Sequence, residues 1–473
     1  MIFNSSDFII FFALVYAAYI RLQSPRQQNW LLLGASYIFY GWAAPRYVAL
    51  LIFYTAATFV VGIKIDDSSR PGARKAWLAA GVLINLGVLG YFKYFGFFVS
   101  EVSAALAKLG LMADQITLRI FLPIGISFFT FQSMAYLIDV SRGVTPAMRD
   151  PLTFAVFKAF FPQLVAGPIE RANNMMPQIE RARTITGNDV AQGIYWALLG
   201  YFLKSVVADR VAPLAAYNFL ILPDAAFNRG PVSALCGIWA FGLQIYGDFA
   251  GYTYIALGVA RLMGIQLQRN FLGPYLATSI QEFWRRWNVT LSFWLRDYLY
   301  IPLGGSRRGA LRTYANLLVV MTLGGLWHGA NWTFMIWGLY HGCGLAVHRA
   351  LGPYLQKTVP DFVRNVGGWI VTLIFVMVGW SLFRAGSPAE FTDIWRRVLT
   401  PGPVSQMDMQ AVGVLSLLSM IVLIVQRVEE YDPSHAPRFG EIAQPYRLAV
   451  CGALFLSVLA VGLSENRFIY FQF

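Results

Sequence analysis

The feature that most constrains this chain is a series of apolar segments, each close to the length at which a helix crosses a membrane. Such a helix needs about 20 mostly apolar residues. Window hydropathy places these segments at residues 7–22, 29–43, 45–63, 76–100, 118–139, 190–217, 232–263, 312–328, 332–350, 366–384, 410–427 and 446–464. We therefore predict an all-α, polytopic integral membrane protein with about 11–13 membrane helices, and we expect the lipid bilayer to surround it.

Composition supports this prediction and limits the other classes of protein. The chain is 57% hydrophobic and only 13% charged, whereas soluble domains carry about 25% charged residues. Its net charge of +13 indicates first the basic cytoplasmic loops of a membrane protein, and only secondly an anionic ligand. We expect no nucleic-acid partner. The sequence shows no internal repeat, and we predict a single membrane-embedded domain over residues 1–473.

The basic residues predict which loops share one side of the membrane. Arginines and lysines gather in alternate loops, at 21–28, 64–75 and 140–151, and again in the stretch 264–311, where aromatic residues between the arginines predict interfacial helices. By the positive-inside rule these loops are cytoplasmic, which places the N-terminus outside. The segment 152–168 is apolar but ends in Pro and Gly, and we expect it to be re-entrant or to cross only half of the membrane.

Two of the four histidines lie in one apolar stretch, GLWHGANWTFMIWGLYHG, at residues 325–342. No Asp or Glu occurs between Tyr298 and Pro360, so the stretch offers no local carboxylate for a catalytic triad or a histidine–carboxylate metal set. His328 and His341 are thirteen positions apart, not the four of a helical zinc pair. We therefore expect no metal site.

The two histidines differ in their sequence surroundings. His328 lies between Trp327 and Gly329 and close to Asn331. An ionisable group at membrane depth is a functional candidate by default, and for His328 catalysis and packing are equally plausible on physical grounds. For His341 the structural interpretation is favoured, because polar residues in such helices often bond a neighbouring helix.

Two further polar residues, Asp248 and Tyr252, lie in the apolar segment 232–263. They either line a path for substrate through the protein or form hydrogen bonds between helices. Residues alone leave these alternatives open.

Several motifs together resemble one family. QEFWRRWNVTLSFWLRDYLYIPLGG (281–305) combined with GLWHGANWTFMIWGLYHG is similar to the membrane-bound O-acyltransferase (MBOAT) family, and more narrowly to its bacterial alginate O-acetyltransferase-like branch. FFPQLVAGPIER (160–171) and QIYGDFAGYTYIALGVARLMG (244–264) support the resemblance, which spans nearly the whole chain. It implies acyl transfer within the membrane, by a helical fold with a central tunnel.

The resemblance also implies catalytic residues. The family's invariant histidine corresponds to His328, which would serve as general base for an acceptor hydroxyl. Its second polar position corresponds to Asn288 in RRWNVTLS, whose amide would stabilise an oxyanion or orient the thioester or the imidazole. The teichoic-acid D-alanyl transfer proteins have histidine at that position, so Asn288 favours acetyl-CoA as donor substrate, with no bound cofactor.

The remaining implied contacts concern substrate and partners. Arg285 and Arg286 are the best candidates for phosphate contact, followed by Arg296, although positive-inside charge explains these arginines equally well. Trp327, Asn331 and His341 are further candidates for contact with substrate. The resemblance implies an exopolysaccharide acceptor, a periplasmic SGNH-type acetyltransferase partner and a location in the bacterial inner membrane.

Two alternatives remain at this stage. One is a D-alanyl transfer protein that uses a carrier-protein thioester. The other is a transporter or a non-catalytic scaffold of a cell-envelope complex. A transporter often has inverted repeats and ionisable pairs at the membrane midplane, and the sequence shows no repeat and few such pairs.

Overall fold

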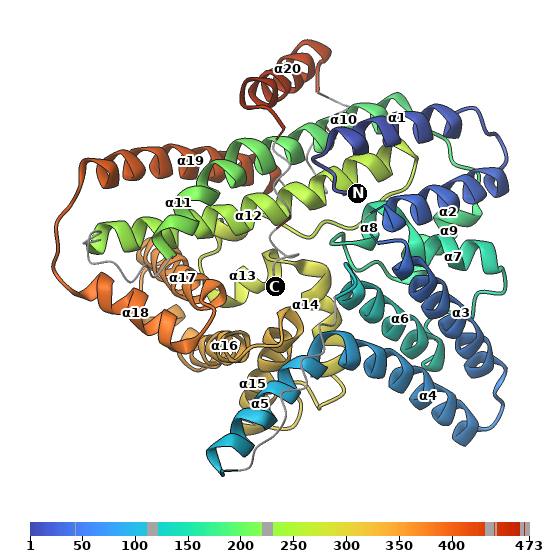
Figure 1. The fold of residues 1–473 in the computed structure, drawn as a ribbon, viewed down its shortest axis with the longest axis horizontal. Helices are drawn as coiled ribbons and strands as arrows, with labels where there is room; N and C mark the ends of the chain where they lie inside the picture. Colours follow the sequence, from blue (N-terminus) through green and yellow to red (C-terminus); the bar gives the residue numbers. More distant parts are fainter. Residues whose placement is uncertain are drawn as a thin grey trace. The chain divides into compact units, whose positions relative to one another are not determined.

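The computed structural model describes residues 1–42, 44–110, 122–219, 230–430, 439, 442–463 and 468. Within these residues the regular structure consists of helices, without strands, so the predicted all-α fold is confirmed (Figure 1). The chain divides into two compact units, one formed by 1–194 and 256–268 and the other by 195–255 and 269–473. We call them unit 1 and unit 2. The single-domain organisation stays a prediction.

The helices coincide with the apolar segments that the sequence predicts. Each predicted segment contains a helix in its described part; residues 118–121 of one segment lie outside the described residues. By length and composition, six helices of the described chain are able to cross a membrane, at Arg46–Asp66, Pro71–Lys108, Gly187–Ala216, Asp361–Arg384, Gln406–Glu429 and Gln444–Val461. The chain is thus a multi-pass membrane protein.

Unit 1 consists of the N-terminal helices and the first part of α10. Its elements are α1 (Ser6–Tyr19), α2 (Pro25–Gly41), α3 (Arg46–Asp67), α4 (Pro71–Leu89), η1 (Gly90–Tyr94), α5 (Phe95–Lys108), α6 (Ile126–Ser141), α7 (Pro151–Ala159), α8 (Phe161–Leu164), α9 (Ala172–Glu180) and α10 (Gly187–Tyr201). Helix α6 packs against α3 and α4 and is buried along almost its whole length. Small residues permit this: a Cβ at Gly62 would lie 2.7 Å from the Tyr136 ring, and one at Gly81 2.6 Å from Leu137.

Two contacts in unit 1 bring together parts of the chain that the charge pattern assigns to one side. The hydroxyl of Tyr19, two residues before loop 21–28, donates to the Met263 carbonyl (2.7 Å), next to the basic stretch 264–311. Arg149 in loop 140–151 forms ion pairs with Asp66 and Asp67 of loop 64–75 (2.8 Å each). These contacts agree with the predicted grouping of the loops.

The segment predicted to be re-entrant forms two short helices, α7 and α8, with a break at Phe160. Pro162 lies in the first turn of α8, where its missing N–H costs nothing. Nine residues of α7 span only about 14 Å, so the segment does not cross as one helix. Buried Lys158 ties α7 to α6, donating to the Phe129 carbonyl (2.8 Å) and the Ser133 hydroxyl (2.8 Å).

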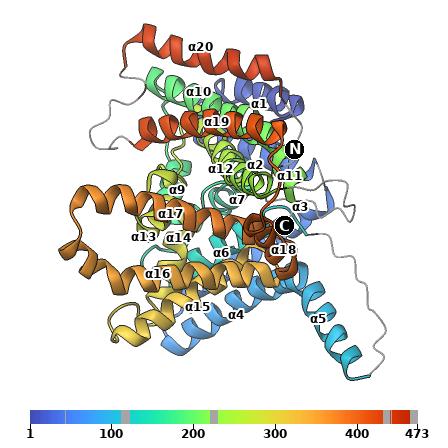
Figure 2. The ribbon, with the colours of Figure 1, turned by 90° about the vertical axis from the view of Figure 1, so that its left-hand side faces the viewer.

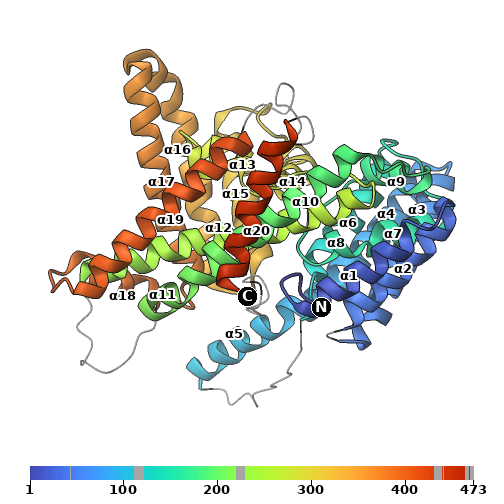
Figure 3. The same ribbon diagram turned by 90° about the horizontal axis from the view of Figure 1, so that it is seen from above.

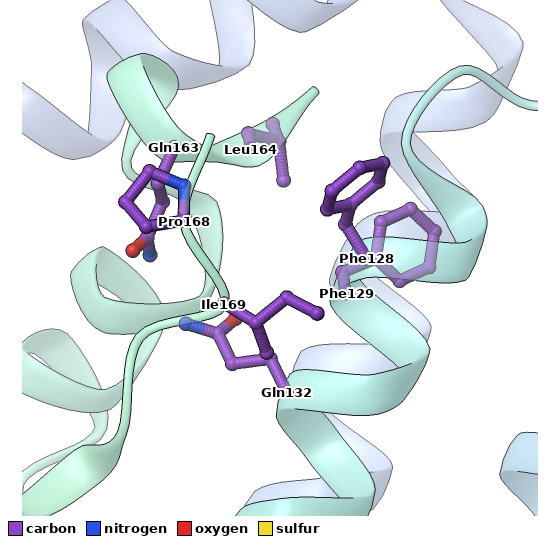
Figure 4. Close-up of a pocket in the computed structure, with 7 residues that line it drawn as sticks. All are labelled: Phe128, Phe129, Gln132, Gln163, Leu164, Pro168 and Ile169. Carbon is purple, nitrogen blue, oxygen red and sulfur yellow. The ribbon is translucent and has the colours of Figure 1, made fainter. Parts of the chain in front are cut away.

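A small cavity lies between α6 and this segment (Figure 4). Its volume is about 10 Å³, room for about one water molecule. Two amide side chains face it, Gln132 from α6 and Gln163 from α8, and the remaining lining is apolar, from Phe128, Phe129, Leu164, Pro168 and Ile169.

Unit 2 contains the histidine stretch. Its elements are the end of α10, η2 (Phe202–Ala208), α11 (Asp209–Phe219), most of α12 (Pro231–Leu262), η3 (Pro274–Leu276), α13 (Ile280–Arg286), α14 (Val289–Leu295), η4 (Arg296–Tyr300), α15 (Ala310–His328), α16 (Trp332–Thr358), α17 (Asp361–Arg384), α18 (Pro388–Leu399), α19 (Gln406–Glu430) and α20 (Gln444–Val461). Helices α15, α16 and α17 pack in sequence order, and α16 and α17 lie side by side (Figures 2 and 3).

Glycines allow α15 and α16 to approach at backbone distance. A Cβ at Gly325 would lie 2.1 Å from the Phe334 carbonyl oxygen, and one at Gly338 2.2 Å from the Met321 carbonyl oxygen. Any larger side chain at either position would separate the two helices. The glycines of the histidine stretch thus fix the helix pair that carries His328 and His341.

Candidate active site

Asn288 occupies a strained turn between two short helices of unit 2. Helix α13 ends at Arg286 and α14 begins at Val289, and Asn288 between them is left-handed, with φ 41° and ψ 57°. It is the only non-glycine residue with positive φ among the described residues. Left-handed backbone costs about 1–2 kcal/mol for most L-residues, and Asn tolerates it better than most. The Val289 N–H donates to the Asn270 carbonyl (3.0 Å) and holds the turn in place.

The Asn288 side chain is buried without a partner. It is 1% exposed, and neither its Oδ1 nor its Nδ2 makes a hydrogen bond in the structure. A buried polar group left unsatisfied costs about 1–3 kcal/mol. Strain and an unsatisfied amide at the same residue are typical of a functional site, where a ligand supplies the missing partner.

His328 is the last residue of α15, where a sharp turn begins. Gly329 continues in extended conformation, and a Cβ there would lie 2.2 Å from the Phe334 ring. Asn331 then caps α16, accepting from the Thr333 N–H (3.1 Å) and donating to the Gly386 carbonyl (2.9 Å). Asn331, a predicted substrate contact, is therefore engaged in holding the turn that positions His328.

The His328 ring is buried among aromatic rings. Its centroid lies 5.0 Å from that of Trp327, 5.1 Å from that of Trp337 and 5.1 Å from that of Phe383. Trp327, the other predicted contact beside His328, therefore packs on the imidazole itself. Sequence reasoning did not identify Trp337, whose only sequence signal is its position one helical turn before His341.

His341 joins the same group of rings. It is 1% exposed, its centroid lies 4.7 Å from that of Trp337, and its Nδ1 accepts a hydrogen bond from the Trp284 indole N–H (3.3 Å). Trp337 thus contacts both histidines, which sequence reasoning had separated into a base and a structural residue. We call this group the ring cluster: Phe283, Trp284, Trp287, His328, Trp337, His341, Trp380 and Phe383.

The ring cluster reaches the residue that precedes Asn288. Trp287 lies 4.7 Å from Trp380, centroid to centroid, and Trp380 stacks at 6.0 Å on Trp337. The Asn288 side chain itself makes no hydrogen bond to His328. The structure therefore places both predicted catalytic residues in unit 2, connected through aromatic rings and without direct hydrogen bonding.

The three predicted arginines have different surroundings. Arg286 forms an ion pair with Glu282 (2.6 Å) and donates to the Leu272 carbonyl (3.1 Å). Arg296 is exposed, pairs with Asp297 (2.6 Å) and lies over the Phe293 ring. Arg285 is exposed, and no described residue forms an ion pair with it.

Local hydrogen bonds explain the electrostatics of Glu282, the partner of Arg286. Burial raises the pKa of this carboxyl, but hydrogen bonds from Thr278 and Arg286 outweigh burial and hold the pKa below its ordinary value. The carboxylate stays ionised near neutral pH, so Arg286 is committed to it. Arg285, next to Arg286 in the chain, has no carboxylate partner among the described residues.

Asp248 and Tyr252 of α12 lie in a closed environment. Asp248 is buried and forms an ion pair with Lys204 of η2 (2.6 Å), which also pairs with Asp209 (2.9 Å). Tyr252 is buried and stacks on the Phe468 ring. These contacts agree with the interhelical alternative for Asp248. Close packing permits them, since a Cβ at Gly247 would lie 2.9 Å from the Leu203 carbonyl oxygen.

Metal binding finds no support in the part of the chain that the structure describes. There, no group of three or more His, Cys, Asp or Glu side chains is arranged to hold an ion. The chemistry available at the ring cluster is that of imidazoles and indole N–H groups, and the Asn288 amide follows Trp287 in the chain. Such groups move protons and donate hydrogen bonds to oxygen.

Comparison with known proteins agrees with the site. The family model described as MBOAT, membrane-bound O-acyltransferase family, matches residues 140–387. A "Probable alginate O-acetylase AlgI" of Azotobacter vinelandii is 38% identical over all of both chains. Its namesake in Pseudomonas aeruginosa is 42% identical over 81% of this chain and 72% of its own. A "Peptidoglycan O-acetyltransferase" of Helicobacter pylori is 36% identical over 81% of this chain and 77% of its own.

The matched region contains Asn288, His328, His341 and Trp337, together with the turns that position them. The similarity to the first relative extends over the whole chain. The chain therefore belongs to the membrane-bound O-acyltransferase family and is a multi-pass membrane enzyme that transfers acyl groups to oxygen.

Proposed function

We propose that the enzyme transfers an acetyl group from cytoplasmic acetyl-CoA to a hydroxyl of an extracytoplasmic polysaccharide. The acetyl group and the polymer are supported by relatives that are similar over most of the chain and are named for O-acetylation of alginate or peptidoglycan. The observation that carries the mechanism is the buried, unpartnered Asn288 amide in the same unit as the ring-enclosed His328.

His328 acts as the general base. The neutral imidazole takes the proton of the acceptor hydroxyl while the hydroxyl oxygen forms a bond to the acyl carbon. At the same time the π electrons of the carbonyl move onto the carbonyl oxygen. When the carbonyl re-forms, the carbon–sulfur bond breaks, and the thiolate leaves with the proton that the imidazole had taken. The products are an ester and a free thiol. The surrounding rings exclude water, which would otherwise hydrolyse the thioester.

Asn288 orients the thioester. Its amide offers both a donor and an acceptor, and the left-handed turn at the start of α14 holds it in one position. Because the amide has no protein partner, a substrate that binds it breaks no existing hydrogen bond. Arg285, exposed at the end of α13 three positions before Asn288, is placed to contact the phosphates of the donor.

The sides of the membrane follow from the basic loops. Loops 21–28, 64–75 and 140–151 would face the cytoplasm, where acetyl-CoA is made, and the N-terminus the periplasm of a bacterial inner membrane. The acetyl group would then cross through a channel past His328 and reach the polymer directly or through the serine of a periplasmic SGNH-type partner. An N-terminal fusion to a reporter active only outside the cytoplasm tests this, and activity of a cytoplasm-only reporter instead would reverse the orientation.

Transfer itself is tested with full-length protein in lipid nanodiscs, radiolabelled acetyl-CoA, and alginate or peptidoglycan fragments as acceptors. The parent should acetylate one of them, and His328→Ala should lower the rate by about 10² to 10⁴. His348→Ala removes a different imidazole, on α16, and is the matched control. If the His328→Ala protein inserts normally and keeps the full rate of acetylation, His328 is not the general base. Transfer only from a carrier-protein thioester would refute acetyl-CoA and favour D-alanyl transfer.

A further inference from the structure

Two nitrogen atoms of the ring cluster lie close to Gly379 of α17. The ideal Cβ position at Gly379 lies 2.8 Å from His341 Nε2 and 3.5 Å from Trp337 Nε1. Both side chains are 1% exposed, and neither nitrogen has a hydrogen-bond partner in the structure. All three residues belong to unit 2.

The hydrogen bond on the other side of His341 determines what Nε2 offers. The Trp284 indole nitrogen is a donor only, so His341 Nδ1, which receives its hydrogen bond, carries no proton. In a neutral imidazole the proton is then on Nε2. Trp337 Nε1 is likewise a donor only. The two unpartnered nitrogens are therefore two N–H donors, and the partner that both require is a hydrogen-bond acceptor.

An oxygen atom is an acceptor that both N–H groups can bind. Gly379 has no side chain, and a Cβ at its position would come closer than van der Waals contact to His341 Nε2, so glycine is what lets the imidazole take this position. Paired N–H donors in a water-excluded site are the arrangement that stabilises the oxyanion of acyl transfer.

The donors lie beside the proposed base. The Trp337 ring meets the His328 ring at 5.1 Å in an edge-on arrangement, and the same ring meets His341 at 4.7 Å. A thioester whose carbonyl oxygen accepts from these two donors would have its carbon in the region that His328 borders.

We propose that Trp337 and His341 form a two-donor site for the carbonyl oxygen of the acyl thioester. As the acceptor hydroxyl adds to the carbon and loses its proton to His328, the carbonyl oxygen gains the electron pair. The two N–H groups stabilise that charge until the carbon–sulfur bond breaks. Trp284 is a positioning residue, because its hydrogen bond keeps the proton of His341 on Nε2. The inference rests on the proposed acyl transfer and adds the residues that stabilise its charge.

Matched substitutions at His341 separate the donor from the packing. His341→Asn keeps an acceptor near Nδ1 for Trp284 but removes the Nε2 donor, whereas His341→Gln places an amide N–H near Nε2. We expect His341→Asn and Trp337→Phe each to lower kcat by about 10- to 100-fold, with KM for acetyl-CoA little changed, and His341→Gln to restore most of kcat. Gly379→Ala should also lower kcat, while Gly367→Ala, which has open space beside it on α17, should not.

A spectroscopic measurement distinguishes this site from a merely structural role. Acetonyl-CoA, a ketone analogue that cannot transfer its acyl group, is labelled with an isotope at the carbonyl and bound to full-length protein. Its carbonyl stretch should be lower in frequency on the parent than in buffer, and should return towards the buffer value on His341→Asn. Equal frequencies on parent and variant, or equal kcat for His341→Asn and His341→Gln, would overturn the proposal.

The two proposals fail in different ways. If His328→Ala abolishes transfer while His341→Asn and Trp337→Phe keep parental kcat, the proposed function stands and the two-donor site is refuted. If His328→Ala retains full activity while the donor variants lose theirs, the base is refuted and the donor site stands. If acetonyl-CoA does not bind the parent, acetyl-CoA is the wrong donor and the two-donor site for its carbonyl is refuted with it.

Discussion

Two groups of polar side chains in unit 2 contrast in how completely their hydrogen bonds are made. Around Glu429, Oε1 accepts from the Tyr195 hydroxyl (2.7 Å), and Oε2 accepts from Arg269 (2.6 Å) and from the Tyr254 hydroxyl (3.3 Å). In the ring cluster, by contrast, His341 Nε2 and Trp337 Nε1 donate to nothing in the structure. One group is closed by a charged acceptor, and the other has donors without an acceptor.

The difference teaches how to separate stabilising polar groups from those that await a substrate. A carboxylate with three donors joins α10, α12 and α19 and the chain at residue 269, and it leaves no capacity for a ligand. The ring cluster contains no carboxylate, in keeping with the absence of Asp and Glu between Tyr298 and Pro360. Its two donors therefore have no acceptor from the protein, and we propose that a substrate oxygen supplies it.

Removing the central carboxylate should have the largest effect on stability. Glu429→Ala leaves Arg269, which is only partly exposed, without its counter-ion, and breaking such a pair on one side costs about 3 kcal/mol, the lower end of the range for buried pairs. We expect a much lower melting temperature and less folded protein in detergent, with kcat per folded molecule close to the parent's. Glu101→Ala, at an exposed position of α5, is the control. A Glu429→Ala protein that melts with the parent would show that the network contributes little.

A fully buried carboxyl, Glu170, tests the comparison in unit 1, where the partners are neutral. Glu170 accepts from the Gln268 N–H and the Asn174 amide, and burial raises its pKa from 4.5 to about 7. A raised carboxyl pKa means that stability is fully present below pH 4.5 and is lost as the pH rises towards 7. The loss amounts to about 3 kcal/mol.

Glu170→Gln should remove this loss. Measured by thermal unfolding in detergent, the variant should match the parent near pH 4.5 and be more stable at pH 8. The difference between the two proteins isolates this one group, because all other titrating groups are shared. A constant difference between parent and variant across that range would show that Glu170 is ionised in the folded state.

Asn288 tests the other half of the comparison, the buried polar groups that have no hydrogen-bond partner in the structure. Asn288→Gly removes the amide but suits the left-handed backbone, whereas Asn288→Ala removes the amide and adds about 1 kcal/mol of strain. We expect both to lower kcat/KM about 100-fold, with only Asn288→Ala losing stability. Steady-state kinetics and thermal unfolding of the two variants check this. Parental kinetics for Asn288→Gly would assign the residue to the turn alone.

The smallest effects should come from the neighbouring arginines of α13. Arg286→Ala breaks an ion pair and a hydrogen bond to a carbonyl, and should cost about 1 kcal/mol of stability. Arg285→Ala should leave stability within about 0.5 kcal/mol and raise KM for acetyl-CoA, with a weaker effect at high salt. A KM that rises for Arg286→Ala and not for Arg285→Ala would reverse their roles.

Local patterns in the sequence carried the prediction of the fold. Apolar segments predicted where helices form, because hydropathy and helix length are properties of consecutive residues. The Pro162 segment was expected not to cross, and it forms two short helices. The glycines around His328 indicated close backbone approach, and Gly325 packs at that distance.

Tertiary contacts decided what the polar residues do. Asp248 offered two interpretations until Lys204, far from it in the chain, proved to be its ion-pair partner. Arg285 and Arg286 look alike in sequence, yet only Arg286 has a carboxylate within reach. Such pairings depend on helices that meet only after folding, so no window of consecutive residues predicts them.

The sequence by itself determined the membrane class, the helical segments, the family motifs and His328 and Asn288 as candidates. Only the tertiary structure decided that the Trp337 ring contacts both histidines and that Trp284 of α13 donates a hydrogen bond to His341. It also decided that one indole nitrogen and one imidazole nitrogen lie beside Gly379. The physical reason is that hydrogen-bond satisfaction is a property of the whole environment of a side chain, and that environment comes from residues distant in sequence.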